Sequence, residues 1–229
     1  MNTIDVFRVA LKLAPYFLGQ NPQQAQSTRT LLTDKDVALL NLKKKAGSVI
    51  VLLGSRDTGK TQLAYRLAEF LERPTYAVSP QQKPPDWITW VKLNEVEERV
   101  KSKSTLILDD LPAYMSNRDY SEQMVQVIEK LIPMVRHEAI PPEFPIGEIH
   151  LIFSSQSSAQ ADRYILDCDG AFLKPLGLLM GDIERPNIAR IYRTMVNEEF
   201  EGKDDAWIQK HAYMLSRGFK GLIEVSKTT

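Results

Sequence analysis

The chain has little cysteine, no long apolar run and no excess of either charge. Its 229 residues include one cysteine, Cys168, so an intramolecular disulfide framework is excluded and a reducing compartment is favoured. No apolar run approaches the roughly 20 residues that span a bilayer, so we expect no transmembrane segment. The 29 basic residues balance the 29 acidic residues, so any contact with nucleic acid would need a local basic patch.

The N-terminal residues are not typical of a secretory signal peptide. Apolar residues recur at helical spacing from Ile4 to Leu18, but Asp5, Arg8 and Lys12 interrupt what would be the apolar core of a signal. We therefore expect a helix that packs on the core of the chain itself, on a neighbouring subunit, or on a capsid or membrane surface.

The strongest motif of the chain lies at Gly54 to Thr61. These residues match G-x-x-x-x-G-K-[ST], the phosphate-binding P-loop, at every required position. The apolar run from Ser48 to Leu53 predicts a buried strand before the motif, and residues Gln62 to Glu72 predict an amphipathic helix after it. Because the motif requires this order of strand, loop and helix, we predict that the chain binds a nucleoside triphosphate.

The residue types of the P-loop explain this chemistry. Gly54 and Gly59 allow a tight turn whose N–H groups point at phosphate oxygens beside a helix N-terminus. Lys60 can reach the β- and γ-phosphates, and the hydroxyl of Thr61 can coordinate Mg²⁺. The residues predicted to bind ATP are Gly54, Ser55, Arg56, Asp57, Thr58, Gly59, Lys60, Thr61 and Gln62.

Two acidic residues end a second predicted strand, Ser104 to Asp110. An ATPase needs a carboxylate to hold hydrated Mg²⁺ and a base to orient the attacking water. We assign Asp109 to the metal and Asp110 to the water, although a strand that merely ends in acidic turn residues would look the same. Gln156 follows the next predicted strand, Ile149 to Ser154. There it could sense the γ-phosphate or the lytic water, or belong to a polar loop that caps a helix.

Arg136 ends a long predicted helix, Ser121 to His137. In an oligomeric ATPase an arginine at the subunit edge can reach the γ-phosphate of the neighbouring subunit, where such a group raises the rate by roughly 10³ to 10⁵. A helix-terminal cation or a surface salt bridge is the equal alternative. Arg118 and Arg163 are competitors for the same role.

Strands and helices alternate through the middle of the chain, which predicts a parallel sheet with helices on both faces. We expect one α/β domain over residues 1–229, with an N-terminal helical extension (1–46), a RecA-like P-loop NTPase core (47–176) and C-terminal helices with a closing strand (177–229). The other expected helices are Asp34 to Lys45, Asn94 to Lys103, Asn187 to Phe200 and Asp204 to Ser216, and the other expected strands are Pro74 to Val78, Ile88 to Leu93, Ala171 to Leu173 and Leu222 to Val225.

These motifs together resemble the FtsK/HerA superfamily of DNA-pumping ATPases, particularly the genome-packaging ATPases of membrane-containing icosahedral viruses. The resemblance covers roughly residues 48–174 and rests on the P-loop, the Asp109-Asp110 pair, Arg136 before a strand, and Gln156 at the end of that strand. It implies a ring of identical subunits that hydrolyses ATP with Mg²⁺ and moves double-stranded DNA into a preformed capsid. The resemblance also implies that the protein acts in the host cytoplasm, at a virion or procapsid vertex, and that its partner is a capsid vertex or membrane protein. The large extra domains of bacterial chromosome translocases are lacking, which favours the viral motor.

Contact with DNA would come from local features of the chain. A loop from Tyr114 to Tyr120 carries Asn117 and Arg118 between aromatic residues and is a weaker candidate for DNA or subunit contact. Basic residues held on a solvated helix face are the alternative to a DNA-binding patch. The candidate basic clusters are Lys43 to Lys45 and the group of Lys83, Lys92, Arg99, Lys101 and Lys103.

Other classes of P-loop protein remain open. A protein-remodelling or helicase-loading ATPase of the AAA+ type should carry an arginine in a C-terminal helical lid, and Arg185, Arg190 and Arg193 are candidates. A nucleotide-controlled binding switch is the second alternative, but a GTPase would need N/T-K-x-D after the P-loop and no such tetrapeptide follows it. A small-molecule kinase would need a compact arginine-rich lid between two strands, which we do not find.

Overall fold

The computed structural model describes residues 33–79, 84–109, 130–143, 145–156, 168–177 and 186–225. Several sequence predictions fall outside this part of the chain. They are the N-terminal helix, Lys83, Asp110, the loop from Tyr114 to Tyr120 with Arg118, the first residues of the helix Ser121 to His137, Arg163 and Arg185.

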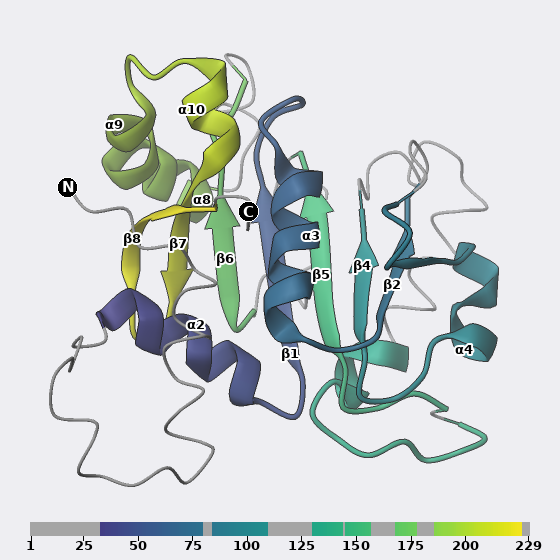
Figure 1. Cartoon of the computed structure of the whole chain (residues 1–229). Coiled ribbons are helices and arrows are strands. Elements are labelled where there is room, and N and C mark those ends of the chain that lie inside the picture. The colour runs from purple at the N-terminus through teal and green to yellow at the C-terminus, as the bar shows by residue number, and fades with distance from the viewer. Residues whose placement is uncertain are drawn as a thin grey trace, which may run out of the picture.

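An eight-stranded sheet, in the order β3-β2-β4-β5-β1-β6-β7-β8, organises the described residues (Figure 1). Neighbours from β3 through β6 in this order pair in parallel, whereas β7 and β8 add antiparallel pairs at one side. The predicted α/β fold with a mostly parallel sheet is therefore confirmed. The strands are β1 (Ser48–Leu53), β2 (Thr75–Val78), β3 (Thr89–Trp90), β4 (Thr105–Leu108), β5 (His150–Ser155), β6 (Gly170–Leu173), β7 (His211–Ser216) and β8 (Lys220–Glu224).

The central strand β1 is apolar along its whole length because both of its faces are buried. Ile50 and Leu52 point into one hydrophobic cluster, whereas Val49, Val51 and Leu53 point into another. Successive side chains of a strand alternate between its faces, and a parallel sheet is covered on both faces. The continuous apolar run of this strand is the sequence pattern that such burial requires.

Helices cover both faces of the sheet. α2 (Asp34–Lys44) and α3 (Lys60–Leu71) pack on one face, which is nearer the viewer in Figure 1. The other face is covered by α4 (Val96–Arg99), by helical residues 130–134, and by a continuous helical run of α8 (Pro186–Ile191), a π-helical turn (Tyr192–Val196) and α9 (Asn197–Phe200). The predicted helices Asp34 to Lys45 and Asn187 to Phe200 are confirmed within a residue or two.

One predicted helix, Asp204 to Ser216, is partly wrong. Its first half forms α10 (Asp205–Lys210), but its second half forms β7. β7 pairs antiparallel with β6, which places Met214 opposite Phe172 and buries Ala212 and Met214 completely. Strand preference depends on the surroundings of a segment, so this long-range pairing overrides the helix-forming composition.

Two shorter predictions also need correction near the sheet edge. The predicted helix Asn94 to Lys103 is only a 3₁₀ turn (Leu93–Glu95) followed by α4, and the chain is extended at Val100. Lys103 adopts a positive φ of 60°, which a continuing helix could not accommodate. The predicted strand Ile88 to Leu93 shortens to β3, the outermost strand of the sheet.

Candidate functional site

The P-loop lies at the carboxyl edge of the parallel strands, between β1 and α3. The neighbouring strands β5 and β6 run parallel to β1 on either side, so the residues that follow them reach the same edge. The carboxyl edge of an open α/β sheet is where ligands bind in such folds. In Figure 1, α10 lies at the same end of the sheet as the loop that joins β1 to α3.

The two motif glycines have backbone conformations that other residues rarely adopt. Gly54 has a φ of 154° and Gly59 has a φ of 85°. A Cβ added to Gly54 would lie 2.5 Å from the Cβ of Lys174, which follows β6. Asp57 also has a positive φ, 61°, at the exposed tip of the loop, where Arg56 is exposed too. The loop is therefore bent so tightly that glycine is required at both ends.

The interior of the P-loop is organised around the main chain of Ser55. Its carbonyl oxygen accepts hydrogen bonds from Nζ of Lys60 at 2.6 Å and from Oγ1 of Thr58 at 2.8 Å. Its own N–H and hydroxyl both donate to the carbonyl of Pro175 at 2.9 Å. Lys60 thus points its ammonium group into the loop, where the motif chemistry needs a cation for phosphate oxygens.

A carboxylate and two hydroxyls meet next to the start of α3. Thr61 Oγ1 donates to Oδ2 of Asp109 at 2.9 Å, and Ser154 Oγ donates to Oδ1 of the same carboxylate at 2.5 Å. Asp109 is buried at the end of β4, and Ser154 is buried in β5. Hydroxyl and carboxylate oxygens are the hard ligands that Mg²⁺ prefers. The donor set therefore fits Mg²⁺ bound beside a triphosphate, with Thr61 as ligand and Asp109 holding its hydration shell.

Gln156 lies at the same edge as the P-loop. It directly follows β5, whose last residue Ser155 is in register with Leu53 at the end of β1. The carbonyl of Ser155 also accepts the N–H of Gly54 at 3.3 Å. Gln156 is half-buried there, while Gln62 is exposed on α3. The structure therefore brings Lys60, Thr61, Asp109 and Gln156 to one edge of the sheet.

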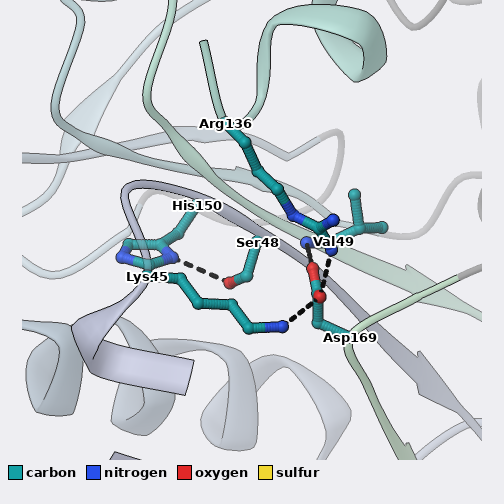
Figure 2. A network of polar contacts seen from close by, with 6 residues as sticks. All are labelled: Lys45, Ser48, Val49, Arg136, His150 and Asp169. Carbon is teal, nitrogen blue, oxygen red and sulfur yellow. Dashed lines mark hydrogen bonds and ion pairs between the residues drawn. The ribbon is translucent and has the colours of Figure 1, made fainter. Parts of the chain in front are cut away.

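Arg136 lies at the opposite edge, where the parallel strands begin. It ion-pairs with Asp169, the residue before β6, and Asp169 also binds Lys45 and the N–H of Val49 (Figure 2). The carboxylate is 5 % exposed, whereas the side chain of Arg136 is 60 % exposed. β1 runs between the two edges, and its six residues correspond to about 20 Å. Arg136 is thus separated from the P-loop of its own chain.

The partners of Asp169 control its charge. Burial alone would raise its pKa, but the hydrogen bonds from Lys45 and Val49, together with the charges of Lys45 and Arg136, hold the pKa below its ordinary value. His150 lies in the same network, with its Nδ1 2.8 Å from the hydroxyl of Ser48 (Figure 2). This group ties α2, β1, β5 and the start of β6 together at the edge away from the P-loop.

Sequence reasoning missed three residues near the P-loop. Ser154 looked like an ordinary strand residue, yet it orients Asp109. Tyr65 lies one helical turn after Thr61 and its buried hydroxyl has no hydrogen-bond partner among the described residues. Burial, and next the charge of Asp109, raise the pKa of Tyr65 to about 12. Lys174 is fully buried beside Gly54. A lysine flanked by apolar residues after a buried strand was the one signal for it.

The fold and this loop define the class of the domain. A glycine-bracketed loop runs from a central parallel strand into a helix, and the acidic end of a nearby parallel strand meets the first threonine of that helix. This is the arrangement of a P-loop NTPase with a RecA-like core.

Comparison with known proteins adds distant likenesses only. No protein-family model matches the chain, and no curated protein matches its sequence. Among solved structures, the Thermotoga maritima RuvB Holliday junction branch migration motor is 17 % identical with a TM-score of 0.40, and the match covers 76 % of this chain and 52 % of RuvB. A mutant of the same RuvB is 19 % identical with a TM-score of 0.42, over 77 % and 54 % of the two chains. A protein described as an ATPase is 12 % identical with a TM-score of 0.44, over 80 % of each chain.

This chain spans about half the length of the RuvB structures. One fold hosts many functions, and the residues of the site determine which chemistry the domain performs. Within the part of the chain that the structure describes, no helix is both long and apolar enough to span a membrane.

Proposed function

We propose that this protein is an ATP-hydrolysing DNA translocase that packages viral double-stranded DNA into a preformed capsid. The observation that carries the hydrolytic part is the meeting of Thr61 and Asp109 across two elements at the end of the P-loop. Lys60, which the motif assigns to the phosphates, directly precedes Thr61. The translocase part rests on the resemblance to DNA-pumping ATPases. We propose that the protein acts in the host cytoplasm, at a virion or procapsid vertex.

Each residue has a distinct role in the proposed hydrolysis. Lys60 neutralises charge on the β- and γ-phosphates, and Asp109 holds the shell of Mg²⁺, which supplies charge stabilisation when bound. Asp110 follows Asp109 directly and is assigned to orient the attacking water. Gln156, level with the P-loop, is assigned to sense the γ-phosphate. Lys60 begins α3, whereas Asp109 and Gln156 follow the neighbouring strands β4 and β5.

The position of Arg136 supports an assembly of several subunits. It is exposed at the edge of the sheet away from its own P-loop, so a nucleotide within its reach would be one bound by another copy. In a ring, that contact would replace its pair with Asp169. Two exposed tryptophans, Trp87 and Trp90, lie on and beside the outermost strand β3 and are of the type enriched at protein interfaces. A homo-oligomeric ring is therefore the proposed state, with a capsid vertex or membrane protein as its docking partner.

The basic clusters give weaker support to DNA contact. Arg99 pairs with Glu95, Lys103 with Glu148 and Lys43 with Glu72, so part of their charge is neutralised within the chain. Lys44, Lys92 and Lys101 remain exposed for phosphate contacts. Binding through phosphates alone would be independent of sequence and would weaken steeply with salt, as a translocase requires.

The alternative function is protein remodelling or helicase loading by an AAA+-like ATPase. Arg190 and Arg193 are exposed on the helical run after the core, where a lid arginine of such an enzyme could lie. Stimulation of hydrolysis by a protein client and not by DNA would favour this alternative. A nucleotide-controlled binding switch would show tight binding with little turnover.

The test is the ATPase rate of the full chain with and without double-stranded DNA, for the wild type, Arg136→Ala and the control Arg217→Ala. Arg217 is exposed and distant in sequence from every motif residue. We expect DNA to stimulate the wild type and the control. Arg136→Ala should lose most activity, and mixing with subunits that supply Arg136 should restore part of it. An assembled wild-type ring that does not respond to DNA would overturn the translocase proposal.

A further inference from the structure

Lys174 is a buried lysine that packs against the first residue of the P-loop. It directly follows β6, and its N–H donates to the carbonyl of Leu53 at 2.7 Å. Its exposed fraction is 0 %. The Cβ of Lys174 occupies the space that a side chain on Gly54 would need. The lysine is therefore placed beside the phosphate-binding loop by both its main chain and its side chain.

The ammonium group of Lys174 binds the carboxyl end of α10. Nζ donates to the carbonyl of Ile208 at 2.7 Å and to that of Gln209 at 3.0 Å. These carbonyls belong to the last turn of the helix, where backbone donors are few, and that of Ile208 also accepts the N–H of His211. Gln209 in turn contacts the other end of the P-loop, because a Cβ added to Gly59 would lie 3.0 Å from its carbonyl oxygen. Lys174 and α10 therefore lie against the two ends of the loop, Gly54 and Gly59.

Among the described residues, no carboxylate pairs with the buried amine of Lys174. Its hydrogen-bond acceptors there are neutral carbonyls, and the salt bridges within the same part of the chain do not include it. Burial, and next the positive charge of Lys60, lower the pKa of Lys174 to about 7. A buried ammonium without a balancing negative charge is destabilising. Phosphates bound by the P-loop next to Lys60 would supply the missing negative charge.

We propose that Lys174 is a positioning residue of the nucleotide site that holds α10 against the P-loop most firmly when phosphates are bound. This inference rests on the proposed nucleotide binding. Within the described part of the chain, the groups that face the amine are Lys60 from α3 and the two carbonyls from α10. Bound phosphates offset the repulsion between Lys60 and Lys174 and so favour the protonated amine. A charged amine makes stronger hydrogen bonds than a neutral one.

Two consequences follow from this coupling. Nucleotide binding takes up a proton at Lys174 when the pH is above about 7, and by reciprocity a higher pH weakens nucleotide binding. Because α10 continues directly into β7 at His211, the state of the phosphate site also reaches the antiparallel strands β7 and β8. α10 is thereby assigned as the element that responds to the nucleotide.

The test is calorimetric binding of a non-hydrolysable ATP analogue to the full chain from pH 7 to 9, in two buffers of different ionisation enthalpy. For the wild type we expect proton uptake and an affinity that falls with pH by up to about tenfold per unit, the limit for one proton. Lys174→Met should lose the uptake and this slope, and Lys174→Arg, which stays charged, should lose the slope as well. The exposed Lys220→Met is the matched control and should behave as the wild type.

Hydrogen exchange supplies a second readout. The analogue should slow exchange of the amides of α10 in the wild type and in Lys174→Arg, but much less in Lys174→Met. If the wild type binds the analogue without proton uptake, or if Lys174→Met keeps the wild-type pH slope, the inference is overturned and the nucleotide site stands. If the wild type binds no analogue, the proposed function fails and this inference fails with it. If Lys174→Met does not fold, loss of the pH slope in Lys174→Arg assigns the proton to Lys174, and an unchanged slope in Lys174→Arg overturns the inference.

Discussion

The hydroxyl of Thr61, at the start of α3, donates a hydrogen bond to the carboxylate of Asp109, at the end of β4, over 2.9 Å. The two residues are far apart in the sequence, and only the fold brings them together. A second hydroxyl, from Ser154 on β5, fixes the other oxygen of the same carboxylate. The fold thus holds one threonine and one aspartate together as a pair.

The first prediction concerns this pair. Asp109→Asn keeps the shape of the side chain but removes its charge, so hydrolysis should be lost while the fold is retained. Ser154→Ala should keep the carboxylate and lose only its orientation, which we expect to lower activity about 10- to 100-fold, as loss of an outer-shell partner does. A titration of ATPase rate against Mg²⁺ measures both effects. If Asp109→Asn keeps the Mg²⁺ dependence of the wild type, Asp109 does not hold the metal.

The second prediction concerns the first P-loop glycine. Gly54→Ala introduces a Cβ that would lie 2.5 Å from the Cβ of Lys174, at a φ that favours glycine. We expect a loss of about 1–3 kcal/mol in the free energy of unfolding, together with weaker nucleotide binding. Gly218→Ala is the control, because an added Cβ there meets nothing within 4 Å. Chemical denaturation measures both variants, and equal stabilities would contradict the packing described for Gly54.

The third prediction is a loss of stability in acid caused by His150. Burial, and next the charge of Arg73, lower the pKa of His150 to about 3. Between the ordinary pKa near 6.5 and pH 3, the unfolded chain binds a proton at this residue that the native chain does not bind. Unfolding therefore takes up a proton, so the free energy of unfolding falls as the pH falls through this window. His150→Asn can keep the contact with Ser48 and should flatten the decline. An unchanged slope in this variant would show that His150 is not the cause.

The fourth prediction concerns Asp169 at the edge away from the P-loop. Asp169→Asn removes the buried charge that pairs with Lys45 and Arg136. Since both cations are partly exposed, we expect a cost of about 1–3 kcal/mol, below that of a fully buried pair. Glu95→Gln, which breaks the surface pair with Arg99, should have a smaller effect than this. If the two substitutions cost the same in thermal or chemical unfolding, Asp169 does not tie this edge together.

The parts of the fold that could be predicted from the sequence are those set by local pattern. β1 is buried on both faces and therefore apolar throughout, and the P-loop motif fixes the strand before it and the helix after it. β7 could not be predicted, because its residues have a helix-forming composition and become a strand only by pairing with β6. In the same way, Asp109 carries a sequence signal as the acidic end of a strand. The network around Asp169 joins segments that are far apart in the sequence and has no local signal.

We propose that Gly54 to Thr61 and Asp109 form the site at which ATP is hydrolysed. The most direct measurement is the steady-state rate of phosphate release from ATP by the full chain, with Mg²⁺ and with the metal chelated, for the wild type, Lys60→Ala and the exposed control Lys220→Ala. We expect Mg²⁺-dependent release of phosphate by the wild type and the control, and none by Lys60→Ala. Release by Lys60→Ala at the wild-type rate, or no release by the folded wild type, would contradict it.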